Sequence, residues 1–438
     1  MSSLKNTSYF FVPFVFNKHA DFSSLVNALD QSELWEQVHD EIMYMLKYVA
    51  DKIDSYNKKT CQCFHYVLKE TKRIQFGLAS ENDWFSTAPH SFHGEKTPIR
   101  FQLLNVQLYC FSTTVGIIAF KVHLEHDDPF WVSNALYHLK KVSREDIFTS
   151  TDYQGTTMLE ISQKLVSELS TATEIKFFYY ANPSTERANV LTYLEVDPKD
   201  NYKRELFYLR RCYSEGFIFA ENEKLDADEI YIPSKDTVWG ISPEAAVCLA
   251  CPGFGRQKFI QGTFYKNFNA QYLFMYVLLL HQKYVLYMFL TKIGIGTYNN
   301  LDTLEDYRHQ LYEFETDFVF SCVTEVPQYQ YLYDKMTEAF SLKKMYEDVH
   351  EPLVSLSEVR RESAENEQKK RDVNVNRALL MLSVLSFFSA LVDSFDFVNS
   401  FFGWFLGDLG VKIVQVCCIV GIVVTVVLVF KNLLDSKK

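Results

Sequence analysis

The sequence predicts an α+β soluble domain followed by a long stalk helix and a two-helix transmembrane hairpin, and three observations support this fold class. The chain of 438 residues has 55 acidic and 44 basic side chains. Its net charge of −11 argues against a scaffold that neutralises nucleic-acid phosphates. Its 37 Phe and 27 Tyr residues exclude a disordered chain. Residues 378–392 and 413–430 carry no charge and are unlike the rest of the chain.

Strands and helices alternate in the soluble part. Residues 10–16 are apolar around Pro13, which is typical of a strand with the proline at an edge or entry point, and no signal-peptide cleavage site follows. Residues 99–125 predict a long hairpin around a Ser-Thr-Thr turn. A helix is predicted over 32–56, where apolar residues recur at spacings of three and four: Leu34, Val38, Ile42, Leu46, Val49 and Ile53. The remaining elements are expected at 157–169 (helix), 175–180 (strand) and 190–196 (strand).

Residues 272–290 form the most apolar segment of the soluble part. His281, Gln282 and Lys283 interrupt the apolar run, whereas a membrane span needs about 20 residues of apolar character. A buried helix of the soluble domain is the favoured interpretation. A further membrane segment is the alternative.

Three groups of residues in the soluble part have side chains that bind metals: Cys61, Cys63 and His65; Cys248 and Cys251; His123, His126 and Asp128. Neither cysteine pair supplies enough ligands for a closed zinc site, so buried structural thiols are favoured over a metal site. Nine cysteines without a secretory signal fit a reducing cytosol. The third group is interpreted as a solvated strand end, with a metal or acid–base role as the alternative. The sequence has no phosphate-binding loop or nucleophile elbow, so we predict no catalytic residue and no enzyme activity.

Two apolar segments predict the transmembrane hairpin. A first span over 378–398 would be about 31 Å long, and a second is placed at 411–430. Basic residues precede the first span and follow the second, so both ends are expected in the cytoplasm. Asp393 and Asp396 imply a water-lined lumen or the membrane boundary. The predicted organisation is a cytoplasmic sensor domain (1–330), a stalk (331–377), the first span (378–398), an outer loop (399–410), the second span (411–430) and a basic tail (431–438).

A polar stripe follows one face of the predicted stalk and first span, because positions spaced alternately by three and four share a helix face. Most of its members are acidic, serine or asparagine. In the stalk they are Glu358, Glu362, Glu365, Lys369 and Asp372, in the span they are Asn376, Leu379, Ser383, Ser386, Ala390 and Asp393, and the row ends at Phe397. A coiled-coil seam would be apolar at these positions. Two helices cannot enclose a channel, so the stripe predicts a homo-oligomer that arranges copies of the first span around an axis. The alternative is a membrane anchor whose serines bond to their own helix.

The order of these parts resembles the CorA family of magnesium transporters and channels. The resemblance covers the acidic soluble domain, a long helix after Pro352, a first span entered at 374–383, a short outer loop, a second span and a basic C-terminus. Members of the family are funnel-shaped homopentamers whose first span lines the pore. The family motif Gly-Met-Asn, which holds hydrated magnesium at the pore mouth, is absent, and the resemblance leaves Asn399, together with Asp396, as the candidates for a polar pore mouth. The resemblance implies a multi-pass inner-membrane protein that conducts a divalent cation such as Mg²⁺.

One branch of the family without Gly-Met-Asn is the set of CorA-like membrane effectors associated with type III CRISPR systems. Their soluble domain resembles a sensor for a nucleotide messenger, in some cases SAM-AMP. The resemblance therefore implies an antiviral cation channel gated by a nucleotide, with the lipid bilayer, further copies of the chain and a small nucleotide as partners, and without direct nucleic-acid binding. A housekeeping transporter of Mg, Co or Ni and a membrane-anchored enzyme are the alternatives.

Overall fold

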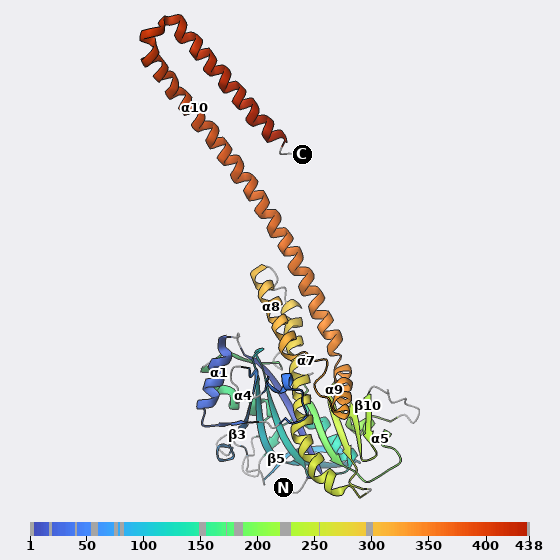
Figure 1. Ribbon diagram of the computed structural model, residues 1–438. Coiled ribbons are helices and arrows are strands. Elements are labelled where there is room, and N and C mark those ends of the chain that lie inside the picture. Colours follow the sequence, from blue (N-terminus) through green and yellow to red (C-terminus); the bar gives the residue numbers. More distant parts are fainter. Residues whose placement is uncertain are drawn as a thin grey trace. The chain divides into compact units, whose positions relative to one another are not determined.

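Two compact units make up the chain, Met1–Val354 and Ser355–Lys438. The first is an α+β unit with a mixed sheet, and the second is helical (Figure 1). The structure is a computed structural model that describes residues 4–16, 20–39, 42–53, 60–73, 78, 83–148, 155–171, 173–178, 187–219, 229–253, 255–294 and 301–435.

A twelve-stranded sheet forms the centre of the first unit. Its main path runs β10-β11-β12-β9-β1-β6-β5-β3-β2, while β4 pairs with β5 and β7, and β8 pairs with β1. The β9–β12 pair is parallel, and the neighbouring β1–β9 and β1–β6 pairs are antiparallel. The strands are β1 Asn6–Phe16, β2 Trp35–Val38, β3 Cys63–Leu68, β4 Trp84–Phe92, β5 Glu95–Phe111, β6 Val115–Leu124, β7 Ile147–Phe148, β8 Ile175–Phe177, β9 Asn189–Glu195, β10 Ile230–Ser234, β11 Thr237–Ile241 and β12 Ala245–Ala250.

Helices cover both faces of this sheet. Successive residues of a strand point to opposite faces. Phe10 and Phe14 of β1 therefore enter the large core cluster with Leu25 of α1 and Leu136 of α3, whereas Phe11 packs on the other side. The helices of the first unit are α1 Ala20–Gln31, α2 Lys47–Ala50, α3 Pro129–Leu139, α4 Met158–Val166, α5 Lys203–Leu209, α6 Tyr265–Asn267, α7 Leu273–Gly294, α8 Leu301–Phe318 and α9 Pro327–Ala339. In Figure 1, α1 and α4 lie on one side of the sheet and α7 on the other.

The first strand is confirmed, but the expectation that Pro13 marks an edge or entry point is wrong. β1 is an interior strand that pairs with β6 on one side and with β9 and β8 on the other. The pairing with β9 ends at Phe11, and the pairing with β8 begins at Phe14. Pro13 therefore lies where the neighbour on that side changes, and a residue without an N–H is tolerated at such a gap.

Three other predicted elements are confirmed. The hairpin over 99–125 is β5 and β6, joined by a tight turn in which Thr114 has a φ of 70°. The helix over 157–169 is α4, and Thr157 begins it with a capping box. The strand over 190–196 is β9. The strand expected at 175–180 is β8, which ends at Phe177, while residues 179 and 180 lie outside the described part of the chain.

The predicted helix over 32–56 is wrong. A helix lies earlier, at α1, and residues Trp35–Val38 form β2. β2 pairs antiparallel with β3, with Trp35 opposite Leu68, and both side chains enter the core. Only α2 is helical among the described residues of 42–53, and residues 54–56 lie outside them. A partner strand distant in sequence thus overrides the local helical spacing.

The apolar segment over 272–290 is a buried helix, as favoured. The helix Phe259–Ile293 is long and apolar enough to cross a membrane, and it is the one such helix among the described residues, but 83% of its most apolar window is buried inside the first unit. The polar residues that interrupt it bond internally. His281 Nε2 lies 2.6 Å from Thr113 Oγ1, and Gln282 donates to the Phe318 carbonyl at 2.6 Å. Lys283 donates to the Pro243 carbonyl at 2.9 Å.

A single helical element, α10, extends over Leu342–Asp435 and supplies all of the second unit that is described. It follows Ser341, whose φ of 55° ends the preceding helix, so the expected start after Pro352 is wrong. Pro352 lies inside the helix. This helical turn belongs to the first unit, and Val349 and Leu353 on it are buried. Gly407 interrupts the helix with φ 61° and ψ 172°, and the orange-to-red ribbon in Figure 1 reverses direction before the C-terminus. The predicted outer loop, 399–410, contains this break.

Candidate functional sites

The predicted polar stripe lies on one continuous helix. Every one of its positions from Glu358 to Asp393 falls within α10, before the break at Gly407. Those with described side chains are exposed: Glu358, Glu362, Glu365, Lys369, Asp372, Asn376, Leu379, Ser383, Ser386 and Asp393. The side chains of Ala390, Asp396 and Asn399 lie outside the described ones. Because a helix repeats every 3.6 residues, these positions share one face.

Hydrogen bonds along the stripe are local to the helix. Ser383 donates from Oγ to the Leu379 carbonyl at 2.8 Å, which is the bond expected for a serine in an apolar helix. In the stalk, Arg361 Nε lies 3.2 Å from Glu365 Oε1. This i,i+4 pair is exposed at both ends, so it contributes little to stability. The stripe is therefore a mainly polar face whose described carboxylates are exposed.

Large apolar side chains of α10 are exposed on its remaining faces. Before Gly407 they include Met381, Leu382, Leu385, Phe387 and Phe388, and after it Leu409, Ile413, Val416, Ile419, Val420 and Val424. The exposed fraction reaches 68% at Met381 and 77% at Leu409. Contiguous apolar surface of this extent marks a lipid-facing or protein-facing region. Lys412–Gly421 is an apolar helical stretch of this region, but it is shorter than a membrane span.

The predicted cysteine groups are structural, as favoured. Cys61, Cys63, Cys248 and Cys251 are all buried. Burial raises the pKa of the Cys248 thiol well above its usual value, which keeps it protonated and unsuited to bind a metal. Cys251 Sγ lies 2.8 Å from the Tyr202 hydroxyl inside the core.

The group from His123 to Asp128 has structural roles. Asp128 caps the N-terminus of α3 by accepting from the backbone N–H groups of Phe130 and Trp131. His123 Nδ1 lies 3.0 Å from the Asn6 carbonyl oxygen. These contacts join the start of β1 to the end of β6. Among the described residues, His123, His126 and Asp128 belong to no group of three side chains whose ligand atoms lie close enough together to bind one metal ion.

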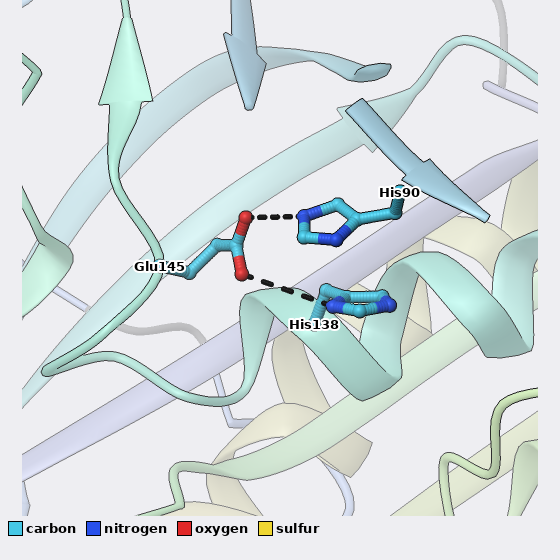
Figure 2. A group of neighbouring side chains, drawn as sticks. All are labelled: His90, His138 and Glu145. Atoms are coloured by element: carbon cyan, nitrogen blue, oxygen red, sulfur yellow. Dashed lines mark hydrogen bonds and ion pairs between the residues drawn. The ribbon is translucent and has the colours of Figure 1, made fainter. Parts of the chain in front are cut away.

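A cluster absent from the sequence predictions consists of His90, His138 and Glu145, which we call the His–His–Glu cluster (Figure 2). His90 Nε2 lies 2.5 Å from Glu145 Oε1, and His138 Nδ1 lies 3.8 Å from Glu145 Oε2. The imidazole rings are stacked, with centroids 3.6 Å apart and planes inclined by 24°. Figure 2 shows the carboxylate directed at both rings.

Three separate elements position this cluster. His90 lies on β4, His138 is in the last turn of α3, and Glu145 follows α3 in a turn where its N–H donates to the Lys141 carbonyl at 3.0 Å. β7, which follows this turn, pairs with β4, and Ser86 lies opposite Phe148. This pairing places the turn beside β4. No local spacing links these residues, so only the β4–β7 pairing could have indicated their proximity.

The cluster is half-buried, and its electrostatics favour neutral imidazole at His138. Burial lowers the pKa of His138 to about 3, and the neighbouring His90 and Lys141 act in the same direction. Lys141 itself lies over the Tyr137 ring, with its ammonium 3.9 Å from the centroid. At neutral pH His138 therefore presents a lone pair on one ring nitrogen.

Comparisons with models of protein families, with curated proteins and with solved structures found no match to this chain.

Proposed function

We propose that the chain is a CorA-like homo-oligomeric cation channel or transporter of the inner membrane, in which copies of α10 line the pore and the first unit controls opening. One observation carries the proposal. Beyond Asn376, α10 exposes many large apolar side chains, and one face of the helix bears a row made mostly of acidic, serine and asparagine side chains.

The apolar side chains support insertion in a bilayer. Removing one Leu or Phe side chain from water contributes about 1.5–3 kcal/mol. The exposed apolar residues between Leu379 and Phe388 would therefore strongly favour a lipid environment over water. The basic residues before the first span and after the second favour an orientation with both ends of the pair in the cytoplasm.

The polar face supports a pore built from several copies. Asp393 would be costly in hydrocarbon unless it faced water. A ring of copies about an axis turns each stripe position into a ring of oxygen atoms that attracts cations and repels anions. Glu362 and Asp372 extend the same face into the stalk and would concentrate cations before the span.

The helix also supplies a route for control. α10 begins within the first unit, where Leu342, Val349 and Leu353 are buried, and continues into the second unit without a break before Gly407. A shift of the helix start would therefore be transmitted along hydrogen-bonded backbone toward the pore-lining positions.

Cation flux into liposomes containing the full chain tests the proposal. Ser386→Leu and Asp393→Ala should each lower flux about tenfold or more, because they narrow the pore or remove a ring of charge. Val384→Leu adds a methylene group on nearly the opposite face of the helix and serves as the matched control, with flux unchanged. Native mass spectrometry should give a homopentamer.

A membrane anchor would behave differently. The protein would insert in liposomes, but wild type, Ser386→Leu and Asp393→Ala would all pass cations at the rate of protein-free liposomes. That result would reject the channel. A monomer in native mass spectrometry would do the same, because one pair of spans has no interior.

A further inference from the structure

We propose that the His–His–Glu cluster binds one Zn²⁺ ion through His90 Nε2, His138 Nδ1 and a carboxylate oxygen of Glu145, and that the ion ties β4 to the end of α3. This site lies within the first unit and does not depend on the proposed channel function.

The positions of the three ligand atoms support the site. Each residue offers one ligand atom, and these atoms all lie within 4.8 Å of one another. Ligands held at about 2.0–2.2 Å from a tetrahedral zinc ion are about 3.3 Å apart. The His138–Glu145 distance of 3.8 Å is close to this value, whereas the 2.5 Å between His90 and Glu145 must lengthen. Small side-chain rotations that open the ring stack bring all three atoms onto one ion.

The present hydrogen bond gives the proton balance of binding. In the structure a proton joins His90 Nε2 to the Glu145 carboxylate. Zinc takes the place of that proton between the same two atoms, and the displaced proton exchanges through solvent to His90 Nδ1, so that His90 binds the ion as a neutral imidazole. Binding therefore replaces a hydrogen bond and a stacking contact with three coordinate bonds.

The ligand types select the ion. Two imidazole nitrogens and one carboxylate oxygen are a usual set for Zn²⁺, whereas Mg²⁺ and Ca²⁺ bind oxygen ligands. Three protein ligands leave the fourth tetrahedral position for water. All three side chains are half-buried, so an ion can reach them and still exchange most of its hydration shell for protein atoms. The opposing feature is Lys141, whose charge lies near His138.

The experiment is a zinc titration of the untagged full chain in detergent, by calorimetry and by competition with a chromogenic chelator. One Zn²⁺ should bind per chain, and Co²⁺ at the same site should give the intense visible absorption of a tetrahedral complex. His138→Gln and Glu145→Gln should each weaken zinc binding at least tenfold. Millimolar Mg²⁺ should not displace the zinc.

A matched control uses another histidine–glutamate pair. His309 lies on α8 with Nε2 3.8 Å from Glu313 Oε1, but its side chain is 73% exposed and it belongs to no group of three ligands among the described residues. His309→Gln should leave zinc affinity unchanged. Equal affinity in wild type, His138→Gln and Glu145→Gln would overturn the proposal, as would an equal loss in His309→Gln.

Folding is monitored separately. Glu145→Gln keeps a hydrogen-bonding side chain beside His90, so its metal-free thermal unfolding should match wild type, and it remains informative if His138→Gln unfolds. Zinc should raise the unfolding temperature of wild type but not that of Glu145→Gln. An identical zinc-induced shift in both proteins would show that the ion binds elsewhere and would overturn the site.

Discussion

Lys121 lies opposite Tyr9 in the β1–β6 ladder, and its ammonium is 5.6 Å from the centre of the Tyr9 ring. Burial lowers the pKa of Lys121 to about 8 from 10.5. The unfolded chain therefore binds more protons between these two pH values, and wild-type stability rises as pH increases from about 8 to 10.5.

Lys121→Met should stabilise the first unit at pH 7 by about 1–3 kcal/mol, because it removes the cost of burying an ammonium group. The loss of the favourable contact between that ammonium and the Tyr9 ring offsets a small part of this gain. The gain should shrink as pH rises through 8 to 10.5, where the wild-type lysine loses its own proton. Thermal unfolding across this pH range measures the effect. Lys176→Met, at an exposed site on β8, is the control, and a gain independent of pH would contradict the explanation.

The ion pair Lys140–Glu244 should contribute more to the free energy of unfolding than the ion pair Arg187–Glu244. Lys140 is 1% exposed, and its Nζ lies 2.5 Å from Glu244 Oε2, whereas Arg187 is 45% exposed. Glu244→Gln leaves a buried ammonium without its counter-charge and should cost about 2–4 kcal/mol in the free energy of unfolding.

Arg187→Gln should cost less than about 1 kcal/mol, because its pair with Glu244 lies at the surface. Lys140→Met combined with Glu244→Gln should recover most of the loss. Chemical denaturation of all four proteins measures these differences, and equal costs at Arg187 and Glu244 would show that burial does not determine the strength of the network.

Gly116→Ala should destabilise the first unit by about 2–4 kcal/mol. A Cβ at this position on β6 would overlap the ring of Phe14, which lies directly opposite it in β1. Gly262→Ala places its Cβ in open space and should change stability by less than about 1 kcal/mol. The unfolding temperatures of the two variants provide the comparison, and similar values would indicate that Phe14 moves aside.

Glu362→Gln should lower cation flux about threefold at low ionic strength, if the stripe is the cation path. Glu367→Gln removes the same charge from a different face of α10, where Glu367 lies 4.0 Å from Arg371, and should leave flux unchanged. Flux at high salt should be the same in both variants, because salt screens the ring of charge. Equal losses in the two variants would place the cation path elsewhere.

Local sequence patterns were sufficient to predict elements that pair with a neighbouring segment of the chain or are defined by their own capping and apolar residues. Apolar residues around a Ser-Thr-Thr turn predicted β5 and β6, and a capped amphipathic run predicted α4. The same reasoning failed over 32–56, where the spacing of apolar residues is helical but Trp35–Val38 pairs with β3. The His–His–Glu cluster was not predicted, because β4, α3 and the turn after α3 meet only through the β4–β7 pairing.

By itself the sequence indicated an acidic α+β part and two uncharged segments near the C-terminus, 378–392 and 413–430, because charge and apolar content are distributed unevenly along it. It also determined which face of α10 is polar, since helical periodicity alone places those residues. Tertiary structure decided that the apolar helix α7 is buried under the sheet, that Pro13 lies in an interior strand, and that two histidines meet one glutamate. These features depend on contacts between distant segments, and no local spacing encodes the partner that a strand or helix will find.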